Sequence, residues 1–367
     1  MASLTALLTS CSGGAKTGTA APPRILTGPF EPSASAPAPP LPPGAFAVTA
    51  GTVVYQAAAD RNHVVWETGP VQGAGPRTAL LQRDLRSGRR TTLALEVFPG
   101  YGLASTTGWV VYAEGLEGRR LVAIAHDGSK RIVLSHSLAA PMAARGELVA
   151  WAEERQGVQQ VIVRDMAKGA AWLAAKRRRC EQGRCHHIGA VALADRGVVF
   201  TRNASGPDTS LVVRRSFADA RVSTVKIVND PQPDLVPSSA GALYHAFGRG
   251  WYRWDFGQTR PRRASFPANS AAQLLGYEHG RWFILTHDGC EAGVVAVRDA
   301  GRRTRIGPPP AVRARAAHAH RTCIALGSLA WTGRQALTAW GLVPAESLEG
   351  HSDAGIAGVG HIGAALP

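Results

Sequence analysis

The sequence contains no run of about twenty apolar residues, the length that a membrane-spanning helix needs. It also lacks the common catalytic motifs: there is no Gly-x-Ser-x-Gly elbow, no His-Glu-x-x-His, no calcium loop of alternating carboxylates and no phosphate loop. Aromatic residues make up only 7% of the chain, and 26 acidic residues face 41 Lys and Arg. The sequence therefore gives no sign of the enzyme classes that these motifs define, and it offers few side chains for catalysis.

The formal net charge is +15, and only five of the basic residues are lysines. A charge of this sign favours nucleic acid, anionic lipid or an acidic polymer as a partner. The arginines are scattered, with five adjacent pairs mostly beside turns, and the compact cluster is Arg177, Arg178 and Arg179, next to Lys176. This scatter argues against nucleic acid and predicts a solvated face or an attraction to an anionic surface.

A short apolar triplet that ends in, or contains, an aromatic residue recurs along the chain. The last residues of successive triplets are 46, 39, 49, 44, 39 and 48 residues apart, an interval typical of four-stranded propeller blades. The triplets are Val64-Val65-Trp66, Val110-Val111-Tyr112, Val149-Ala150-Trp151, Val198-Val199-Phe200, Ala242-Leu243-Tyr244, Arg281-Trp282-Phe283 and Leu329-Ala330-Trp331.

Turn residues complete the repeat. Six of the seven aromatics have a glycine three to five residues upstream, as suits a hairpin between the first and second strands, and five repeats carry Asp followed by Gly after the third strand. The sequence predicts an all-β fold: a seven-bladed β-propeller of four-stranded antiparallel blades over residues 45–343. The aromatics are expected to fill the wedges between blades.

The seventh repeat has three convincing strands and no fourth. Because an unpaired sheet edge exposes backbone polar groups, we expect a strand from the other end of the chain to complete it. Residues 45–49 are the first apolar stretch after the tether, and residues 46–50 are predicted to pair with the strand that holds Trp340.

With this strand pattern and its Asp/Gly turns, the chain resembles the TolB-like, WD-repeat-like seven-bladed propellers of bacterial secreted lipoproteins. The regular Trp-Asp, Gly-His and Gly-Gly signatures of propeller repeats are absent. The resemblance implies an architecture and an extracytoplasmic compartment, and it transfers no catalytic residue.

The ends of the chain fit that compartment. Leu8-Thr9-Ser10-Cys11 is similar to a lipobox, which makes Cys11 the lipidation candidate and residues 1–11 a lipoprotein-type signal segment, although no Lys or Arg precedes the cysteine. Either the true start lies upstream or Cys11 is an ordinary cysteine. Residues 12–44 are rich in Pro, Ala, Gly and Ser and predict a disordered tether, and residues 344–367 predict a flexible tail.

Four further cysteines suggest disulfides in an exported protein. The blade topology places Cys180 and Cys185 in one connection and Cys290 and Cys323 on neighbouring blades at the same rim, so these two pairings are preferred among three; free thiols are the alternative. Histidines gather on that rim: His186, His187, His287, His318 and His320. Their spacing matches no standard zinc motif, so we predict no metal site and no cofactor. His126-Asp127-Gly128 is interpreted as turn chemistry.

The function predicted is a lipid-anchored, extracytoplasmic, non-catalytic binding or scaffolding module at the bacterial cell envelope. We expect a monomer at an anionic membrane surface, with an unknown protein or envelope polymer as partner and no nucleic acid. The expected binding residues are Arg177, Arg178, Arg179, His186, His187, Trp251, Tyr252 and Trp254. Blade packing is the alternative role for the three aromatic residues. Two alternatives remain: a lactonase- or glycoside-hydrolase-like propeller enzyme with its site at the central channel, and a metal-binding envelope protein.

Overall fold

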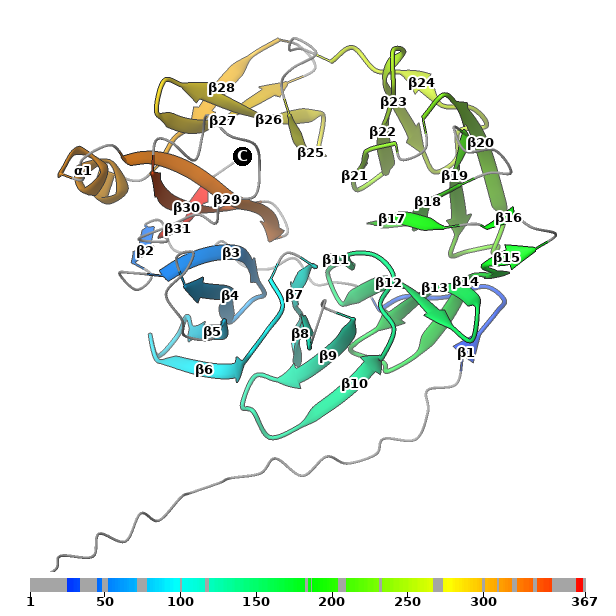
Figure 1. The fold of residues 1–367 in the computed structure, drawn as a ribbon, viewed down its shortest axis with the longest axis horizontal. Coiled ribbons are helices and arrows are strands. Elements are labelled where there is room, and N and C mark those ends of the chain that lie inside the picture. Colours follow the sequence, from blue (N-terminus) through cyan, green and yellow to red (C-terminus); the bar gives the residue numbers. More distant parts are fainter. Residues whose placement is uncertain are drawn as a thin grey trace, which may run out of the picture.

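The computed structural model describes residues 25–33, 45–47, 52–70, 78–99, 101–115, 119–181, 184–185, 187–203, 209–230, 233–266, 273–298, 301–308, 310–318, 322–332, 335–344 and 361–365. Its sheets are arranged side by side around a common axis (Figure 1). No helix within these residues is long and apolar enough to cross a membrane.

Five blades each contain four antiparallel strands that follow one another along the chain, with the first strand toward the axis (Figure 1). The first blade consists of β3 (Thr52–Ala59), β4 (His63–Pro70), β5 (Ala79–Asp84) and β6 (Arg90–Leu95), and the second of β7 (Leu103–Ser105), β8 (Trp109–Glu114), β9 (Arg120–Ala125) and β10 (Arg131–Ser135). The third consists of β11 (Ala143–Arg145), β12 (Leu148–Arg155), β13 (Val158–Asp165) and β14 (Ala171–Arg178), and the fourth of β17 (Ile188–Ala194), β18 (Gly197–Asn203), β19 (Thr209–Ser216) and β20 (Val222–Val228). The fifth consists of β21 (Leu235–Pro237), β22 (Gly241–Ala246), β23 (Gly250–Asp255) and β24 (Arg262–Arg263).

Apart from β1 (Ile25–Leu26) and the small separate hairpin of β15 (Cys180–Glu181) and β16 (Arg184–Cys185), the remaining strands form one eight-stranded sheet. It contains two antiparallel groups, namely β25 (Leu274–Glu278), β26 (Arg281–Asp288), β27 (Glu291–Arg298) and β28 (Arg303–Ile306), and then β29 (Thr322–Thr332), β30 (Gln335–Pro344), β31 (His361–Ala365) and β2 (Ala45–Ala47). A parallel bridge between Glu291 and Ile324 joins the groups. The structure thus has six blade-like sheets where the sequence predicts seven separate ones.

The disulfide explains this merging. Cys290 and Cys323 are bonded with their Cα atoms 4.6 Å apart, and the Ile324 N–H donates to the Cys290 carbonyl at 2.8 Å. This cross-link holds the start of β29 against the start of β27. The predicted Cys290–Cys323 pairing is therefore confirmed. A helix, α1 (Pro310–His318), precedes β29 and was not predicted; its Val312 is buried against the same sheet.

The predicted strand pairing at the end of the ring is wrong. Trp340 lies opposite Leu326 of β29 and His361 of β31, so both edges of β30 are occupied. The N-terminal strand β2 pairs instead with β31, with Phe46 opposite Ile362. Part of the predicted flexible tail is therefore the strand that pairs with β30. Residues 48–50 lie outside the described part of the chain.

The core lies between neighbouring sheets. The aromatics Trp66, Tyr112, Trp151, Phe200, Tyr244 and Phe283 are all buried in such clusters, as the repeat predicts. The side chain of Trp331 is outside the described residues. Leu337 and Ala339 of β30 pack with Trp66 and Val64 of the first blade, so apolar contacts join the last sheet to the first.

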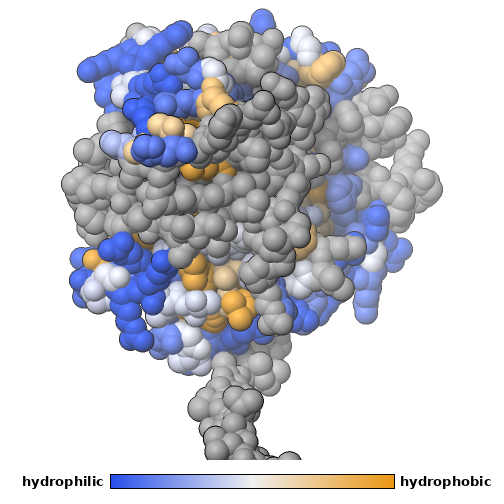
Figure 2. All heavy atoms as spheres, turned by 60° about the vertical axis from the view of Figure 1, so that its left-hand side comes forward, coloured by the Kyte–Doolittle hydropathy of each residue, from blue (hydrophilic) through white to orange (hydrophobic). Residues whose placement is uncertain are grey.

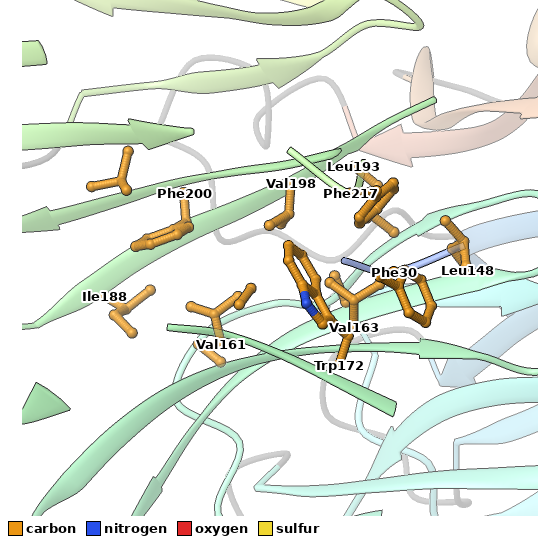
Figure 3. Close-up of a cluster of buried hydrophobic side chains, with 14 of the residues drawn as sticks. Phe30, Leu148, Val161, Val163, Trp172, Ile188, Leu193, Val198, Phe200 and Phe217 are labelled. Atoms are coloured by element: carbon orange, nitrogen blue, oxygen red, sulfur yellow. The ribbon is translucent and has the colours of Figure 1, made fainter. Parts of the chain in front are cut away.

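Part of the predicted disordered tether is ordered. Residues Ile25–Ser33 lie at the seam between the third and fourth blades, where β1 (Ile25–Leu26) adds a parallel strand to the outer edge of β14. Phe30 is 3% exposed and contacts Trp172 and Phe217, as Figure 3 shows. Phe30 thus supplies a core contact in a segment whose Pro- and Ala-rich composition predicts disorder.

The described surface is mostly polar. In the face shown in Figure 2, hydrophilic side chains dominate and hydrophobic ones form small, separate areas. The large apolar side chains that are exposed, among the described residues, are Ile25, Leu95, Val133, Val222, Val228 and Phe247. Grooves between blades are therefore better candidates for a binding site than a flat apolar face.

Candidate functional site

A groove of about 970 Å³ lies between the first and second blades. We call it the 1–2 groove. One wall is the outer strand β6 with the β5–β6 turn, and the other comes from β8, β9, β10 and the β9–β10 turn. Its lining mixes charged, hydroxyl and aliphatic side chains: His63, Gln82, Asp84, Ser87, Arg89, Thr91, Thr92, Leu93, Ala94, Leu95, Tyr112, Glu114, Ile124, His126, Asp127, Gly128 and Arg131.

Three chemically reactive side chains meet at one end of this groove. Asp60 and His63 flank the β3–β4 turn, and His126 directly follows β9 of the next blade. The Asp60 carboxylate spans both histidines: Oδ1 lies 3.3 Å from His63 Nδ1, and Oδ2 lies 3.1 Å from His126 Nε2. The two imidazole rings stack with centroids 3.9 Å apart. The cluster thus joins two blades through side chains that could hold a cation.

The Asp60 carboxyl group is held in its ionised form. Burial alone would raise its pKa, but hydrogen bonds from His126, His63, Ser105 and the Asn62 N–H outweigh burial and hold the pKa far below its usual range. The Asn62 N–H donates to Oδ1 at 2.7 Å. A carboxylate fixed in this way is ready to accept hydrogen bonds or to ligate a metal ion.

Gln82 fixes the orientation of His126. Its Nε2 donates to the His126 carbonyl oxygen at 3.1 Å, which leaves Oε1 to accept the Nδ1–H of the His126 ring at 2.5 Å. The other ring nitrogen, Nε2, then faces the Thr106 carbonyl oxygen at 2.8 Å as well as Asp60. A nitrogen that faces two oxygen acceptors needs a cation, either a proton or a metal ion, between them.

The opposite end of the groove is a paired charge cluster. Glu114 forms ion pairs with Arg131 and, at 3.2 Å, with Arg120, and it accepts the Tyr112 hydroxyl at 3.2 Å. Burial and the Glu114 carboxylate raise the pKa of Tyr112 to about 12. These groups are satisfied among themselves and form a polar end wall.

The predicted basic cluster is exposed. Arg177 and Arg178 end the outer strand β14, and Arg179 forms an ion pair with Glu154 at 2.9 Å. This end of the blade carries the β12–β13 turn, whereas the Asp60 cluster lies at the β3–β4 and β9–β10 turns, on the opposite face of the ring. The structure therefore adds a candidate site on a face that the sequence analysis did not select.

The predicted aromatic anchors lie within the packing. Trp254 is 1% exposed and covered by the Arg214 guanidinium, 4.4 Å from its ring centre. Tyr252 stacks on Tyr244 and belongs to the same cluster, while Trp251 packs beside Phe266. Trp254 therefore cannot contact a partner without rearrangement.

The remaining predicted residues are dispersed. Cys180 and Cys185 lie opposite each other in the small hairpin of β15 (Cys180–Glu181) and β16 (Arg184–Cys185), so their pairing stays a prediction that the backbone register favours. The ring of His187 lies 3.4 Å from Gln159, and His287 and His318 are exposed. Cys11, His186 and His320 lie outside the described residues.

His126 was not among the functional candidates predicted from the sequence, although the blade register distinguishes it. The residue that directly follows the third strand is Leu85, Met166, Phe217 and Phe256 in the other four-stranded blades, and each of these packs in an apolar cluster. A histidine at this position breaks the packing pattern. Alignment of the blades at their third strands would have found it.

No family model and no curated protein matches the chain. Solved structures match it in shape. One, from a study of two prolyl endopeptidases, has a TM-score of 0.56 at 12% identity and is matched over 81% of this chain and 47% of its own, so this chain spans about half of its length. The propeller domain of the Trilobed protease from Pyrococcus furiosus has a TM-score of 0.54 at 5% identity, over 87% and 96% of the two chains.

TolB from Acinetobacter baumannii is also among the structural neighbours, with a TM-score of 0.40 and 13% identity over 82% of this chain and 80% of that chain. At these identities the first two comparisons show the β-propeller fold alone. That supports the propeller part of the predicted resemblance but not its seven blades, and a fold of this kind does not define a function.

Proposed function

We propose that this chain is a lipid-anchored, extracytoplasmic β-propeller that binds extended peptide segments of envelope proteins in the grooves between its blades and catalyses no reaction. We also propose that β29, β30, β31 and β2 form a seventh blade, with the N-terminal strand β2 outermost. One observation carries the functional proposal: an extended segment, Ile25–Ser33, already occupies the seam between two blades.

The contacts of that segment are those of peptide recognition by strand addition. Besides the parallel pairing of β1 with β14, the Phe30 N–H donates to the Phe217 carbonyl at 2.7 Å, and Trp172 Nε1 donates to the Gly28 carbonyl at 2.7 Å. The Arg215 guanidinium donates to the Thr27 carbonyl at 2.8 Å. Backbone groups thus hold the segment, and Phe30 supplies the apolar anchor.

The 1–2 groove, between the first and second blades, corresponds in blade register to the occupied seam between the third and fourth blades. By strand register, Thr91 of β6 corresponds to Trp172 of β14, and His126 corresponds to Phe217. Among the described residues no strand pairs with the outer edge of β6. Since the aromatic pair is replaced by Thr and His, the groove suits an extended peptide with a polar side chain where Phe30 lies in the occupied seam.

A binding function receives more support than the alternative of an enzyme with its active site at the central channel. Two carboxylates near the inner strand ends already have partners: Asp60 is engaged by both histidines, and Glu278 forms an ion pair with Arg145 at 2.7 Å and accepts the Ser239 N–H at 3.2 Å. A hydrolytic site of the usual kind needs such carboxylates free to face substrate.

The compartment and the anchor rest on the disulfide and the sequence. A disulfide such as Cys290–Cys323 is typical of oxidising compartments, and residues 1–24 would carry the lipid attachment at Cys11 and a spacer. Detergent phase partitioning of the wild type against Cys11→Ser tests the anchor: the wild type is expected in the detergent phase and the variant in the aqueous phase. Equal partitioning of both contradicts the lipid anchor and leaves the peptide-binding proposal untouched.

The exposed Arg177, Arg178 and Arg179 would hold the domain at an anionic surface. Replacement of all three by serine is expected to reduce retention on vesicles that contain anionic lipid, and added salt should reduce retention of the wild type in the same way. Unchanged retention of the serine variant removes this part of the proposal.

Peptide binding is tested on the full chain with a display library of nine-residue peptides, the length of Ile25–Ser33. A selected peptide should slow hydrogen exchange at the amides of β6 and not at those of β20. Leu95→Asp should weaken binding at least about tenfold, because Leu95 lines the groove. Val222→Asp is the matched control, since Leu95 and Val222 are each 56% exposed on an outer strand.

Protection at β6 that Leu95→Asp abolishes supports the proposal. A library that yields no binder, or binders that Leu95→Asp and Val222→Asp weaken equally, refutes it. If β6 is already protected in the free protein and the protection depends on protein concentration, the groove is filled by a second copy of this chain, which also refutes the proposed partner.

A further inference from the structure

We propose that Asp60, His63 and His126 bind a divalent transition-metal ion of the zinc class at the end of the 1–2 groove. The proposal goes beyond peptide binding: His63, His126 and Gln82 also line the 1–2 groove, but the metal site can be tested without any peptide. No residue of the set belongs to the His- and Cys-containing rim that the sequence analysis considered for a metal.

The spacing of the donor atoms fits such an ion. Tetrahedral zinc holds its ligands at roughly 2.0–2.2 Å, which places neighbouring donors about 3.3–3.6 Å apart. The Asp60 oxygens lie 3.1 Å from His126 Nε2 and 3.3 Å from His63 Nδ1, and the three ligand atoms lie within 4.8 Å of one another. Two imidazoles and one carboxylate also form a donor set that zinc and related ions prefer over calcium or magnesium.

The surroundings orient the ligands as in protein metal sites. A ligating histidine usually donates its second ring N–H to an oxygen that fixes the tautomer. Gln82 does this for His126: its Oε1 faces Nδ1 at 2.5 Å, which directs the Nε2 lone pair at Asp60. That lone pair faces the Thr106 carbonyl as well, and a metal ion would relieve the approach of an unprotonated nitrogen to two oxygens.

The site is reachable, and the fold does not require it. His63 and His126 line the 1–2 groove, so an ion has a path from solvent. The positions that correspond to His126 in other blades hold Met166, Phe217 and Phe256, whose side chains only pack. A histidine in place of a packing residue, with its Nε2 3.1 Å from the buried Asp60 carboxylate, is a second, independent sign of a ligand.

The rings of His63 and His126 stack with an interplanar angle of 12°, so their lone pairs lie in two nearly parallel planes and do not converge on one point between the rings. An ion that both rings bind must draw His63 out of the stack toward Asp60. Metal binding is therefore expected to change the environment of both rings, which the histidine signals in an NMR spectrum report directly.

The test is titration of the full chain with Zn²⁺ by calorimetry and with Co²⁺ by its visible absorption near neutral pH. The wild type should bind one ion with a tetrahedral Co²⁺ spectrum. His126→Phe should lose this site, and it should still fold, because phenylalanine occupies the same position in the fourth and fifth blades. Asp60→Asn should also lose the site, and Gln82→Leu should weaken binding by about 10–100-fold.

His287→Ala is the matched control, since His287 is an exposed histidine near Cys290 on the opposite rim. It should bind the ion as the wild type does. Absence of binding by the wild type overturns the proposal, as does equal binding by the wild type and His126→Phe. A loss confined to His287→Ala assigns the ion to the opposite rim and overturns it too. These titrations contain no peptide, so their failure is distinct from failure of the proposed function.

Discussion

Substitution of Phe30 by alanine is predicted to release the whole N-terminal segment from the seam between the third and fourth blades. Phe30 is 3% exposed and lies with its ring centre 5.8 Å from that of Trp172 and 5.4 Å from that of Phe217. Truncation of a buried phenylalanine removes about 3–5 kcal/mol. Ordering of a short segment costs about 1–2 kcal/mol per residue in conformational entropy, which opposes the contacts that dock it. The net free energy of docking is therefore small, and the loss of the Phe30 contacts exceeds it.

The release has two measurable consequences. The Ser33 N–H, which donates to Asp165 Oδ2 at 2.5 Å, should lose protection from hydrogen exchange by about a hundredfold or more, because each 1.4 kcal/mol is roughly a factor of ten. The free energy of unfolding should fall to the value of a chain truncated before residue 34, and no further. Once the segment is undocked, its remaining residues no longer contribute to stability.

Glu31→Ala is the control, because the Glu31 side chain is exposed and the variant keeps the backbone carbonyl that accepts a hydrogen bond from Lys168 at 2.9 Å. It should keep the protection of the Ser33 amide. The reasoning is refuted if Phe30→Ala leaves that protection unchanged, or if truncation lowers the free energy of unfolding by several kcal/mol more than Phe30→Ala does. The second result would mean that the segment is held mainly by its backbone hydrogen bonds.

Three further predictions follow from the fold. Gly241→Ala should destabilise the protein by about 1–3 kcal/mol in urea unfolding, because a Cβ there would lie 2.2 Å from the Trp254 carbonyl oxygen, whereas Gly108→Ala, with open space around it, should not. Reduction of Cys290–Cys323, which closes 33 residues, should lower the free energy of unfolding by about 3–4 kcal/mol, and reductant should have a clearly smaller effect on the double serine variant. The pKa of Tyr112 is raised to about 12 in the folded protein, whereas an unfolded tyrosine ionises near pH 10. The free energy of unfolding should therefore fall by up to about 2–3 kcal/mol as pH rises from about 10 to 12. The fall should be smaller in Tyr112→Phe, and an equal fall in both proteins contradicts the assignment.

The repeated strands and turns could be predicted from the sequence because they depend on local chemistry. Each apolar triplet fills a wedge between blades, as the burial of Tyr112 and Phe200 illustrates, and that need recurs with the blade length. The third-strand turns are also local: Asp84 accepts the N–H groups of Arg86 and Ser87, and Gly88 has a φ of 70°. Such features leave a periodic trace that one sequence is sufficient to show.

The way the ring ends could not be predicted in the same way, because it depends on competition between distant segments for one sheet edge. Residues 361–365 and residues 45–47 are both short and apolar, and nothing local decides which pairs with β30. The merging of the last strands into one sheet likewise follows from a contact between Cys290 and Cys323, 33 residues apart. The pairing was predicted, but its effect on the sheet was not.

The Asp60 cluster shows why a site in a propeller escapes a motif search. Asp60 and His63 come from the turn between the first and second strands of one blade, and His126 comes from the turn between the third and fourth strands of the next. Asp60 and His126 are therefore 66 residues apart in sequence and form no motif of fixed spacing. Each also has an ordinary local role, since Asp60 accepts the Asn62 N–H and His126 opens a turn. What distinguishes them is the comparison across blades: the seam that holds Phe30 has aromatic side chains where the 1–2 groove has Thr91 and His126. One interface thus keeps a piece of the chain itself through apolar contacts, and the corresponding one carries the polar groups that a separate ligand would need. A repeat fold can acquire a site in this way by exchanging packing residues at one interface, while the remaining interfaces supply the stability.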